Sequence, residues 1–183
     1  MNYYIKEEPP VNAVIENILT RRSIRSFEDK KIPREDMELI VKAGQYAPSA
    51  MNMQTFQLTV VQNEEVIRKL YTAIPKYMDG LQEGYNFYGC KNLVLISDKE
   101  GKEIGQMDCA CVAENIFLAA HSLGIGSVWI NQLRQTSDGP EVRAALTEAG
   151  VPADHRVWVI AALGYASAPA QLKEKTAAVH WCE

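Results

Sequence analysis

Apolar residues recur every three or four positions in several parts of the chain, which is the spacing of amphipathic helices. The first such segment carries Val11, Val14, Ile15, Ile18 and Leu19. A second helix is expected to begin near Pro33 and to end before Pro48, because proline is tolerated in a first helical turn but disfavours helix in the residue before it. Its inward face would carry Met37, Ile40, Val41 and Gly44. A third helix is predicted from its capping residue Asn63 to about Tyr71, with Val66, Ile67 and Leu70 inward.

The longest predicted helix covers about 109–123, with Asp108 as its N-cap and Gly124 as its left-handed stop. Its alanine content indicates a central, closely packed helix. A last helix is expected near 140–149, capped by Ser137 or Asp138 and ended by Gly150.

Four apolar or alternating segments predict strands at 56–61, 93–96, 127–130 and 157–163, the last being the most buried. Helices and strands are intermixed and the first element is helical, which favours an α+β fold over a regular doubly wound sheet. Residues 72–92, with three glycines and many aromatic residues, are expected to form a flexible or functional connection that could include a short helix.

A chain of 183 residues is most simply a single domain, 1–183, in which 1–10 forms an N-terminal arm set off by Pro9 and Pro10. The formal net charge of −4 gives no support for nucleic-acid binding. No apolar run approaches the roughly 20 residues that cross a bilayer, and the first residues lack the apolar core of a signal peptide. We therefore expect a cytoplasmic protein without a membrane segment.

The four cysteines do not suggest a disulfide framework in a chain of this length. Cys109 and Cys111 are too close for the usual zinc pair, so buried thiols are favoured over a metal site completed by His121 or by His180 and Cys182. A thiol or metal protein stays open as a weaker alternative. Dinucleotide, Walker and nucleophile-elbow motifs are absent, which leaves either a binding module or an enzyme whose cofactor supplies the chemistry.

One segment is unusually rich in groups that bind anions. The run from Arg21 to Phe27 contains three guanidinium groups and two hydroxyls, directly after the first predicted helix: Arg21, Arg22, Ser23, Arg25 and Ser26. Arginine forks match phosphate oxygens in pairs, so this run could hold a phosphorylated cofactor. Arginines also stabilise the negative end of a helix, and that role remains equally open.

A second polar cluster follows the second predicted helix, in the run Ala47-Pro-Ser-Ala-Met-Asn-Met-Gln54. Its hydroxyl and two amides could bind a heterocycle with mixed donors and acceptors. The same residue types are common in ordinary turns, which is the simpler reading of this run by itself.

Taken together, the motifs resemble the nitroreductase family of FMN-dependent oxidoreductases. The resemblance covers about 11–181. It rests on the arginine-serine run, the Pro-Ser-x-x-Asn-x-Gln turn, a Gly-x-Gly-Ser-x-Trp-Ile run at 124–130, a late Leu163-Gly164-Tyr165 and a terminal Val179-His180-Trp181. It implies an α+β nitroreductase fold with a central mixed β-sheet flanked by helices. It also implies a homodimer with two FMN sites at the interface.

The resemblance assigns cofactor-binding roles by position. The FMN phosphate, ribityl chain and pyrimidine edge would be contacted by the first run, namely Arg21, Arg22, Ser23 and Arg25. The flavin would be reached from the partner subunit by Pro48, Ser49, Ala50, Asn52 and Gln54. The ring would lie by Ile130 and Asn131, with the Asn131 backbone N–H facing flavin N5 and with Gly126 and Trp129 shaping the same wall. In place of the family's usual C-terminal arginine, Lys173 or Lys175 could supply a point charge.

The implied reaction is ping-pong hydride transfer from NADH or NADPH, through flavin N5, to a nitroaromatic, quinone or similar electron-poor acceptor. No side chain is expected to be catalytic, and no metal is expected. Two alternatives remain. One is a flavin-binding module without turnover. The other is a different flavin reaction on the same scaffold, such as dehalogenation, flavin fragmentation or dehydrogenation of a peptide ring. The chain is shorter than many members before the long helix, which leaves the substrate pocket undefined.

Overall fold

The computed structural model describes residues 12–81, 83–101 and 103–183, so the predicted arm at 1–10 lies outside it. Its centre is a four-stranded sheet formed by β1 (Gln57–Val61), β2 (Asn92–Lys99), β3 (Gly126–Ile130) and β4 (His155–Gly164). The strand order is β1-β2-β4-β3, and all three pairs are antiparallel. The α+β class is confirmed. The predicted mixed sheet is wrong, because the described strands pair with one another only in antiparallel fashion. The one parallel pairing in the described ranges is an isolated bridge from Ser23, outside the sheet, to Ser127.

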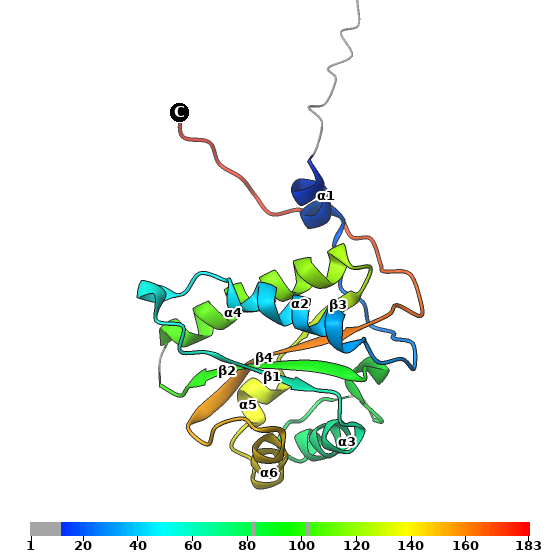
Figure 1. Ribbon diagram of the computed structural model, residues 1–183, viewed down its shortest axis with the longest axis vertical. Helices are drawn as coiled ribbons and strands as arrows, with labels where there is room; N and C mark the ends of the chain where they lie inside the picture. The colour runs from blue at the N-terminus through cyan, green and yellow to red at the C-terminus, as the bar shows by residue number, and fades with distance from the viewer. Residues whose placement is uncertain (1–11, 82, 102) are drawn as a thin grey trace, which may run out of the picture.

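Helices cover both faces of this sheet, as Figure 1 shows. One face packs against α2 (Arg34–Gln45) and α4 (Glu103–Ser122), and the other packs against α3 (Glu64–Ala73) and α6 (Pro140–Ala149). The short α5 (Gln132–Thr136), which directly follows β3, was not predicted. Each side of the sheet therefore has its own apolar core.

The central strand β4 supplies both cores because its side chains alternate between the two faces. Val159, Ala161 and Leu163 pack toward α2 and α4, whereas Ile160 and Ala162 pack toward α3 and α6. The register against β2 shifts between Ile96 and Ser97, which leaves Trp158 as an extra residue on β4. Such a β-bulge changes the direction of the side chains around it.

Several predicted helix ends are confirmed, and two predicted caps are wrong. The Asn63 side chain accepts hydrogen bonds from the second and third residues of α3, and Gly150 ends α6 in the left-handed region. Asp108 is not an N-cap, because α4 begins at Glu103 and Asp108 lies inside it. Neither Ser137 nor Asp138 caps α6. Its N-cap position is held by Gly139, without a side-chain hydrogen bond.

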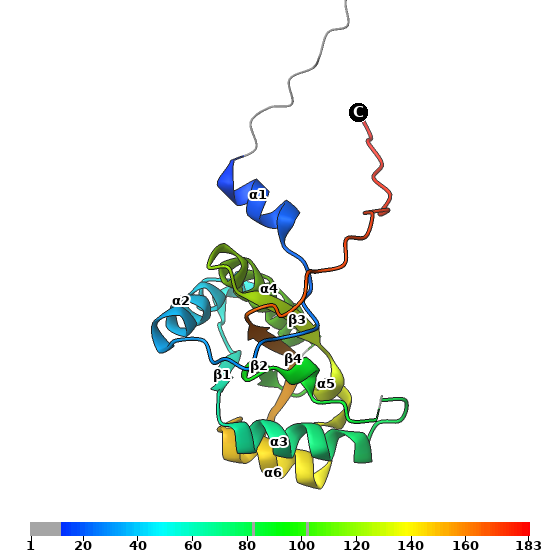
Figure 2. The same ribbon diagram turned by 90° about the vertical axis from the view of Figure 1, so that its right-hand side faces the viewer.

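The first helix, α1 (Ala13–Thr20), lies outside both cores, and none of its residues is buried. Its apolar side chains are exposed, Val14 to 67% and Leu19 to 59%. The C-terminal segment 168–183 has no secondary structure, and Trp181 is 78% exposed. Figures 1 and 2 show that both segments extend away from the sheet on the side of α4. Within one chain, these apolar residues have no core to enter.

The described residues of 72–92 pack against the core formed with α3 and α6 more closely than the sequence indicated. Two short 3-10 turns, Ile74–Lys76 and Phe87–Gly89, interrupt the connection, and Phe87 is fully buried. The Phe87 ring meets Tyr71 and Tyr85 edge to face, at centroid distances of 6.2 and 5.8 Å. This part of the connection is therefore anchored by aromatic packing.

Candidate functional site

The arginine-rich run lies along the free edge of β3. The Ile24 N–H donates to the Ser127 carbonyl at 2.9 Å, and Ser23 forms a parallel bridge with Ser127. Because β3 leads directly to Asn131, one stretch of backbone brings together the runs 21–25 and 126–131. They are two of the four groups of candidate residues that the sequence singled out, the others being 48–54 and the C-terminal lysines.

Gly126 is required by this packing. A Cβ added there would lie 2.6 Å from Ile24 Cγ1 and 3.1 Å from the Gly164 carbonyl oxygen. The absence of a side chain at Gly126 therefore lets Ile24 pack against β3 and holds the arginine-rich run at the sheet edge. Gly126 acts on the candidate site through Ile24.

We expect Gly126→Ala to destabilise the fold by about 1–3 kcal/mol, the usual cost of overpacking a tight contact. Urea unfolding of the single variants and of the Ile24→Ala/Gly126→Ala double variant would measure it. The double variant should lose less stability than the two single losses combined, because the shortened Ile24 side chain leaves space for the new methyl group. Additive losses would contradict this contact.

The three arginines of the run have different environments. Arg22 donates from Nη1 to the Leu19 and Arg21 carbonyls at 2.6 and 2.8 Å, so it stabilises the end of α1. The Arg21 side chain is 23% exposed, and its Nε lies 3.9 Å from Glu114. Arg25 is exposed and has no ion pair among the described residues. The helix-end role therefore applies to Arg22, while Arg21 and Arg25 remain available to an anion.

His121 at the end of α4 lies in the field of these arginines. The Thr20 hydroxyl donates to the Glu16 carbonyl at 2.7 Å, so the 2.9 Å contact from His121 Nε2 to that hydroxyl has the imidazole as donor. Burial, followed by the charges of Arg21 and Arg22, lowers the pKa of His121. A lowered pKa favours the neutral ring at neutral pH, so the positive charge here belongs to the arginines.

The other end of β3 opens on a cavity of about 370 Å³. It is lined by Gln106, Met107, Ala110, Trp129, Asn131, Arg134, Trp158 and Val159. The Trp129 indole donates to the Asn131 side-chain oxygen, which fixes that amide beside the ring. The buried Trp158 Nε1 has no hydrogen-bond partner among the described residues. Aromatic walls with an unused donor suit a planar ring that carries acceptor atoms.

Sequence reasoning missed Trp158 as a residue of this cavity. Simple alternation along this apolar run would place it with Ile160 and Ala162 on the α3 and α6 side, whereas it packs at the edge of the α2 and α4 core. The bulge in β4 changes that alternation, and no feature of the sequence marks the bulge.

The polar turn at 48–54 lies elsewhere on the same chain. The Ala50 N–H donates to Asp108 on α4 at 3.1 Å, whereas the arginine-rich run lies by His121 at the far end of α4. Asp108 and His121 are thirteen positions apart on one helix, which is about 20 Å at 1.5 Å per residue. Among the described residues, no hydrogen bond or ion pair joins this turn to 21–25 or 126–131. Within one chain the turn therefore lies about 20 Å along α4 from the arginines, although its anchor Asp108 is next to Met107, which lines the β3 cavity.

The predicted lysines are also remote from the arginines. Lys173 and Lys175 are exposed on the extended C-terminal segment, and neither forms an ion pair among the described residues. Figure 2 shows this segment leaving the body of the protein. Their contribution to a phosphate site stays a prediction that needs a second chain.

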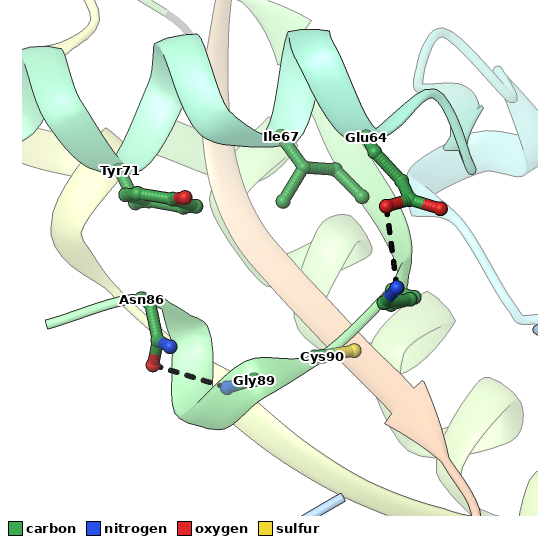
Figure 3. Close-up of a pocket in the computed structure, with 7 residues that line it drawn as sticks. Glu64, Ile67, Tyr71, Asn86, Gly89 and Cys90 are labelled. Carbon is green, nitrogen blue, oxygen red and sulfur yellow. Dashed lines mark hydrogen bonds and ion pairs between the residues drawn. The ribbon is translucent and has the colours of Figure 1, made fainter. Parts of the chain in front are cut away.

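A different cavity, of about 200 Å³, lies between α3 and the turn at 86–91 (Figure 3). The Lys91 ammonium that borders it pairs with Glu64 at 3.2 Å and also with Asp29. The Asn86 side chain accepts from the Gly89 N–H at 3.1 Å. These groups satisfy one another, so we assign no ligand to this cavity.

The cysteines do not form a thiol or metal centre among the residues that the structure describes. Cys109 is buried and Cys111 is exposed, so the expectation of buried thiols holds for the first alone. Burial raises the pKa of the Cys109 thiol, and the nearby Asp98 and Asp108 raise it further. No group of three or more His, Cys, Asp or Glu side chains in the described ranges could hold a metal ion. A protonated, buried thiol is a poor nucleophile and a poor ligand.

The fold and the β3 edge define an α+β protein suited to an elongated anion with a planar aromatic end. The Nitroreductase family model matches residues 18–165. The chain belongs to the nitroreductase family. In the described ranges, no helix combines the length and apolar character needed to span a bilayer.

Individual relatives agree with this family. A nitroreductase of Bacteroides fragilis, crystallised with bound FMN, is 44% identical to this chain, and the two structures align with a TM-score of 0.84. The alignment covers 94% of this chain and 100% of that one. A protein of Archaeoglobus fulgidus, provisionally named NADH dehydrogenase/NAD(P)H nitroreductase, is 35% identical over 148 residues, 81% of this chain and 82% of that protein. The FMN reductase (NADPH) of Bacillus subtilis is 28% identical over 143 residues, which are 70% of this chain and 57% of that relative. This chain thus spans less than two thirds of the reductase's length.

Proposed function

We propose that this protein is an FMN-dependent NAD(P)H oxidoreductase. One observation carries the proposal. The run with Arg21 and Arg25 and the cavity at Trp129 and Asn131 both lie along β3. The paired segments could hold the two ends of one FMN molecule, with the phosphate by the arginines and the ring by the indoles. Membership of the family, and the bound FMN of the Bacteroides fragilis nitroreductase, support this assignment.

Within this function the chain's own residues bind and orient. Arg21 and Arg25 would neutralise a phosphate that carries close to two negative charges. The backbone N–H of Asn131 would face the N5 edge of the flavin ring. Bound FMN would supply hydride acceptance from NADH or NADPH at N5 and electron donation to a nitroaromatic, quinone or similar acceptor. No side chain is required as a nucleophile.

The proposed active form is a homodimer, because α4 exposes an apolar stripe. Ile104, Met107, Cys111 and Glu114 follow one another at spacings of three and four residues, and all four are exposed. Glu114 is the one charged member of this set. An apolar stripe on the longest helix, which also contacts the exposed helix α1, is typical of an association surface.

Two-fold symmetry across this stripe would also complete the site. If two copies of α4 pack in opposite directions over their whole length, the N-terminal half of one helix, with Asp108, faces the C-terminal half of the other, with His121. The turn at 48–54 of one subunit then approaches the run 21–25 of its partner, although about 20 Å of helix separates them within one chain. This arrangement accounts for the distance between the 48–54 turn and the arginine-rich run within one chain.

Absorption spectroscopy of the purified protein tests the proposal. We expect flavin bands in the visible spectrum, loss of these bands when NADH or NADPH is added without oxygen, and their return when a quinone is added. Free FMN at the same concentration is the control for direct reduction. A colourless protein that does not bind added FMN would refute the proposal, and bound flavin that neither nicotinamide reduces would favour a binding module.

A further inference from the structure

The turn at 49–54 has a backbone that its own sequence does not favour. Met51, Asn52 and Gln54 have φ values of 51°, 54° and 50°, which lie in the left-handed region. Such conformations cost of order 1 kcal/mol or more for residues with a side chain and persist where surrounding contacts impose them. All three residues are exposed, so burial of their own side chains does not supply those contacts.

Part of the support comes from within the turn. The Gln54 N–H donates to the Ser49 hydroxyl at 3.2 Å, and the Gln54 side chain donates to the Asn52 side-chain oxygen at 2.8 Å. These bonds set the positions of the exposed amides relative to one another. They do not fix the turn to the rest of the subunit.

Two buried carboxylates make that connection, one at each end of the turn. Asp108 is 6% exposed and accepts from the Ala50 N–H at 3.1 and 3.3 Å. Asp98 is fully buried and accepts from the Thr55 hydroxyl at 2.8 Å. The two acids come from different elements, α4 and β2, so the turn is held against both the helix and the sheet.

The surroundings of Asp98 explain how its carboxylate can be buried. Its second oxygen accepts from the Lys99 N–H at 2.6 Å. A Cβ on Gly105 would lie 2.8 Å from Asp98 Oδ2, so the glycine in the first turn of α4 leaves the space that the carboxylate fills. A negative group at a helix N-terminus is stabilised by the helix dipole. The acid therefore has partners in the fold besides the turn.

We propose that Asp98 and Asp108 are positioning residues that hold the 49–54 turn ready to contact the flavin in the partner subunit. This inference rests on the proposed function, in which the turn reaches FMN. Neither acid touches the cofactor in this proposal. Their effect is transmitted through Thr55 and through the Ala50 backbone to the exposed amides of Asn52 and Gln54.

Thr55→Val is the mildest test, because it keeps the side-chain shape and removes the hydroxyl. In ligand-free protein, hydrogen exchange at 49–54 should accelerate. The FMN dissociation constant, followed by flavin fluorescence, should rise about tenfold if one charge-assisted contact is lost. Thr59→Val is the matched control. Thr59 is a buried threonine whose hydroxyl accepts from Gln57 at 2.9 Å in β1, outside the turn, and this variant should change neither measurement.

Variants at Asp108 separate positioning from general stability. Asp108→Asn keeps an oxygen that can accept from Ala50, so it should weaken FMN binding less than Asp108→Ala does. A lower melting temperature without a change in the FMN dissociation constant of Thr55→Val would overturn the inference while leaving the proposed function intact. Failure of the unmodified protein to bind FMN would remove both.

Discussion

Arg21→Ala should lose FMN affinity by about ten- to a hundredfold, the loss expected when one hydrogen-bonded charge contact is removed. The Arg21 side chain is partly buried beside β3, and its nearest acid, Glu114, is 3.9 Å away. That distance is too long for a hydrogen bond, so the guanidinium retains its capacity to bind phosphate. The variant protein should purify with less flavin than the unmodified protein.

Two matched arginine variants make this result specific. Arg34→Ala removes a side chain that is 88% exposed and pairs with Glu38 on α2, so FMN binding should not change. Arg22→Ala removes the hydrogen bonds to the carbonyls of Leu19 and Arg21 and should mainly lower stability. Fluorescence titration with FMN would give the dissociation constants, and thermal melts would give the stabilities. Equal FMN affinity in Arg21→Ala and Arg34→Ala would reject Arg21 as a phosphate ligand.

The fold elements that the sequence predicted well are those in which apolar spacing and burial coincide. The 157–163 run corresponds to β4, whose residues enter two cores, and Asn63 caps α3 as its position suggested. The sequence also placed Met37 and Ile40 on the inward face of α2, where both are buried. In these elements one physical effect, removal of apolar surface from water, determines the outcome.

Two of the wrong element boundaries occur where a polar side chain is buried because its hydrogen-bond partner belongs to another helix, strand or turn. β2 extends beyond the predicted apolar run because Asn92 and Ser97 are buried in it and satisfied by partners. Asp108 was expected to cap a helix, but its carboxylate accepts from Ala50 in a distant turn. Local sequence cannot reveal such partners, since they are more than 50 residues away.

The candidate site, like the fold, was only partly predictable from the sequence. The sequence singled out 21–25 and 126–131 separately, and only the fold shows that they lie side by side on one sheet edge. The cavity residue Trp158 depends on a bulge that apolar spacing does not reveal. The turn at 48–54 remains apart from the arginine-rich run in one chain, and the C-terminal lysines lie on an extended segment, so the roles of both stay predictions.

Subunit complementation should restore FMN binding from two defective parents. One parent would carry Arg21→Ala and Arg25→Ala, and the other would carry Asn52→Ala and Gln54→Ala. If each site combines the arginines of one subunit with the turn of the other, a heterodimer contains one intact site and one doubly defective site. The purified heterodimer should then bind FMN at about half of the sites of the unmodified dimer, as two-fold symmetry requires.

The measurement needs heterodimers that are separated from both parents. Two different affinity tags on co-expressed chains, followed by purification on both tags in turn, provide them. Flavin released on denaturation is then counted per dimer and compared with each parent homodimer, which should retain little FMN. The parents must themselves be dimeric by light scattering, because α4 and its exposed stripe are unchanged in both.

The alternative geometry gives the opposite result. If the arginines and the turn of the same chain formed each site, both sites of the heterodimer would be defective, and it would bind no more FMN than its parents. The thirteen positions of α4 between Asp108 and His121 argue against that geometry, since they separate the two groups by about 20 Å along a rigid helix. Half-occupied heterodimers would thus establish that the protein is a dimer. They would also establish that the 48–54 turn contacts FMN from the partner subunit.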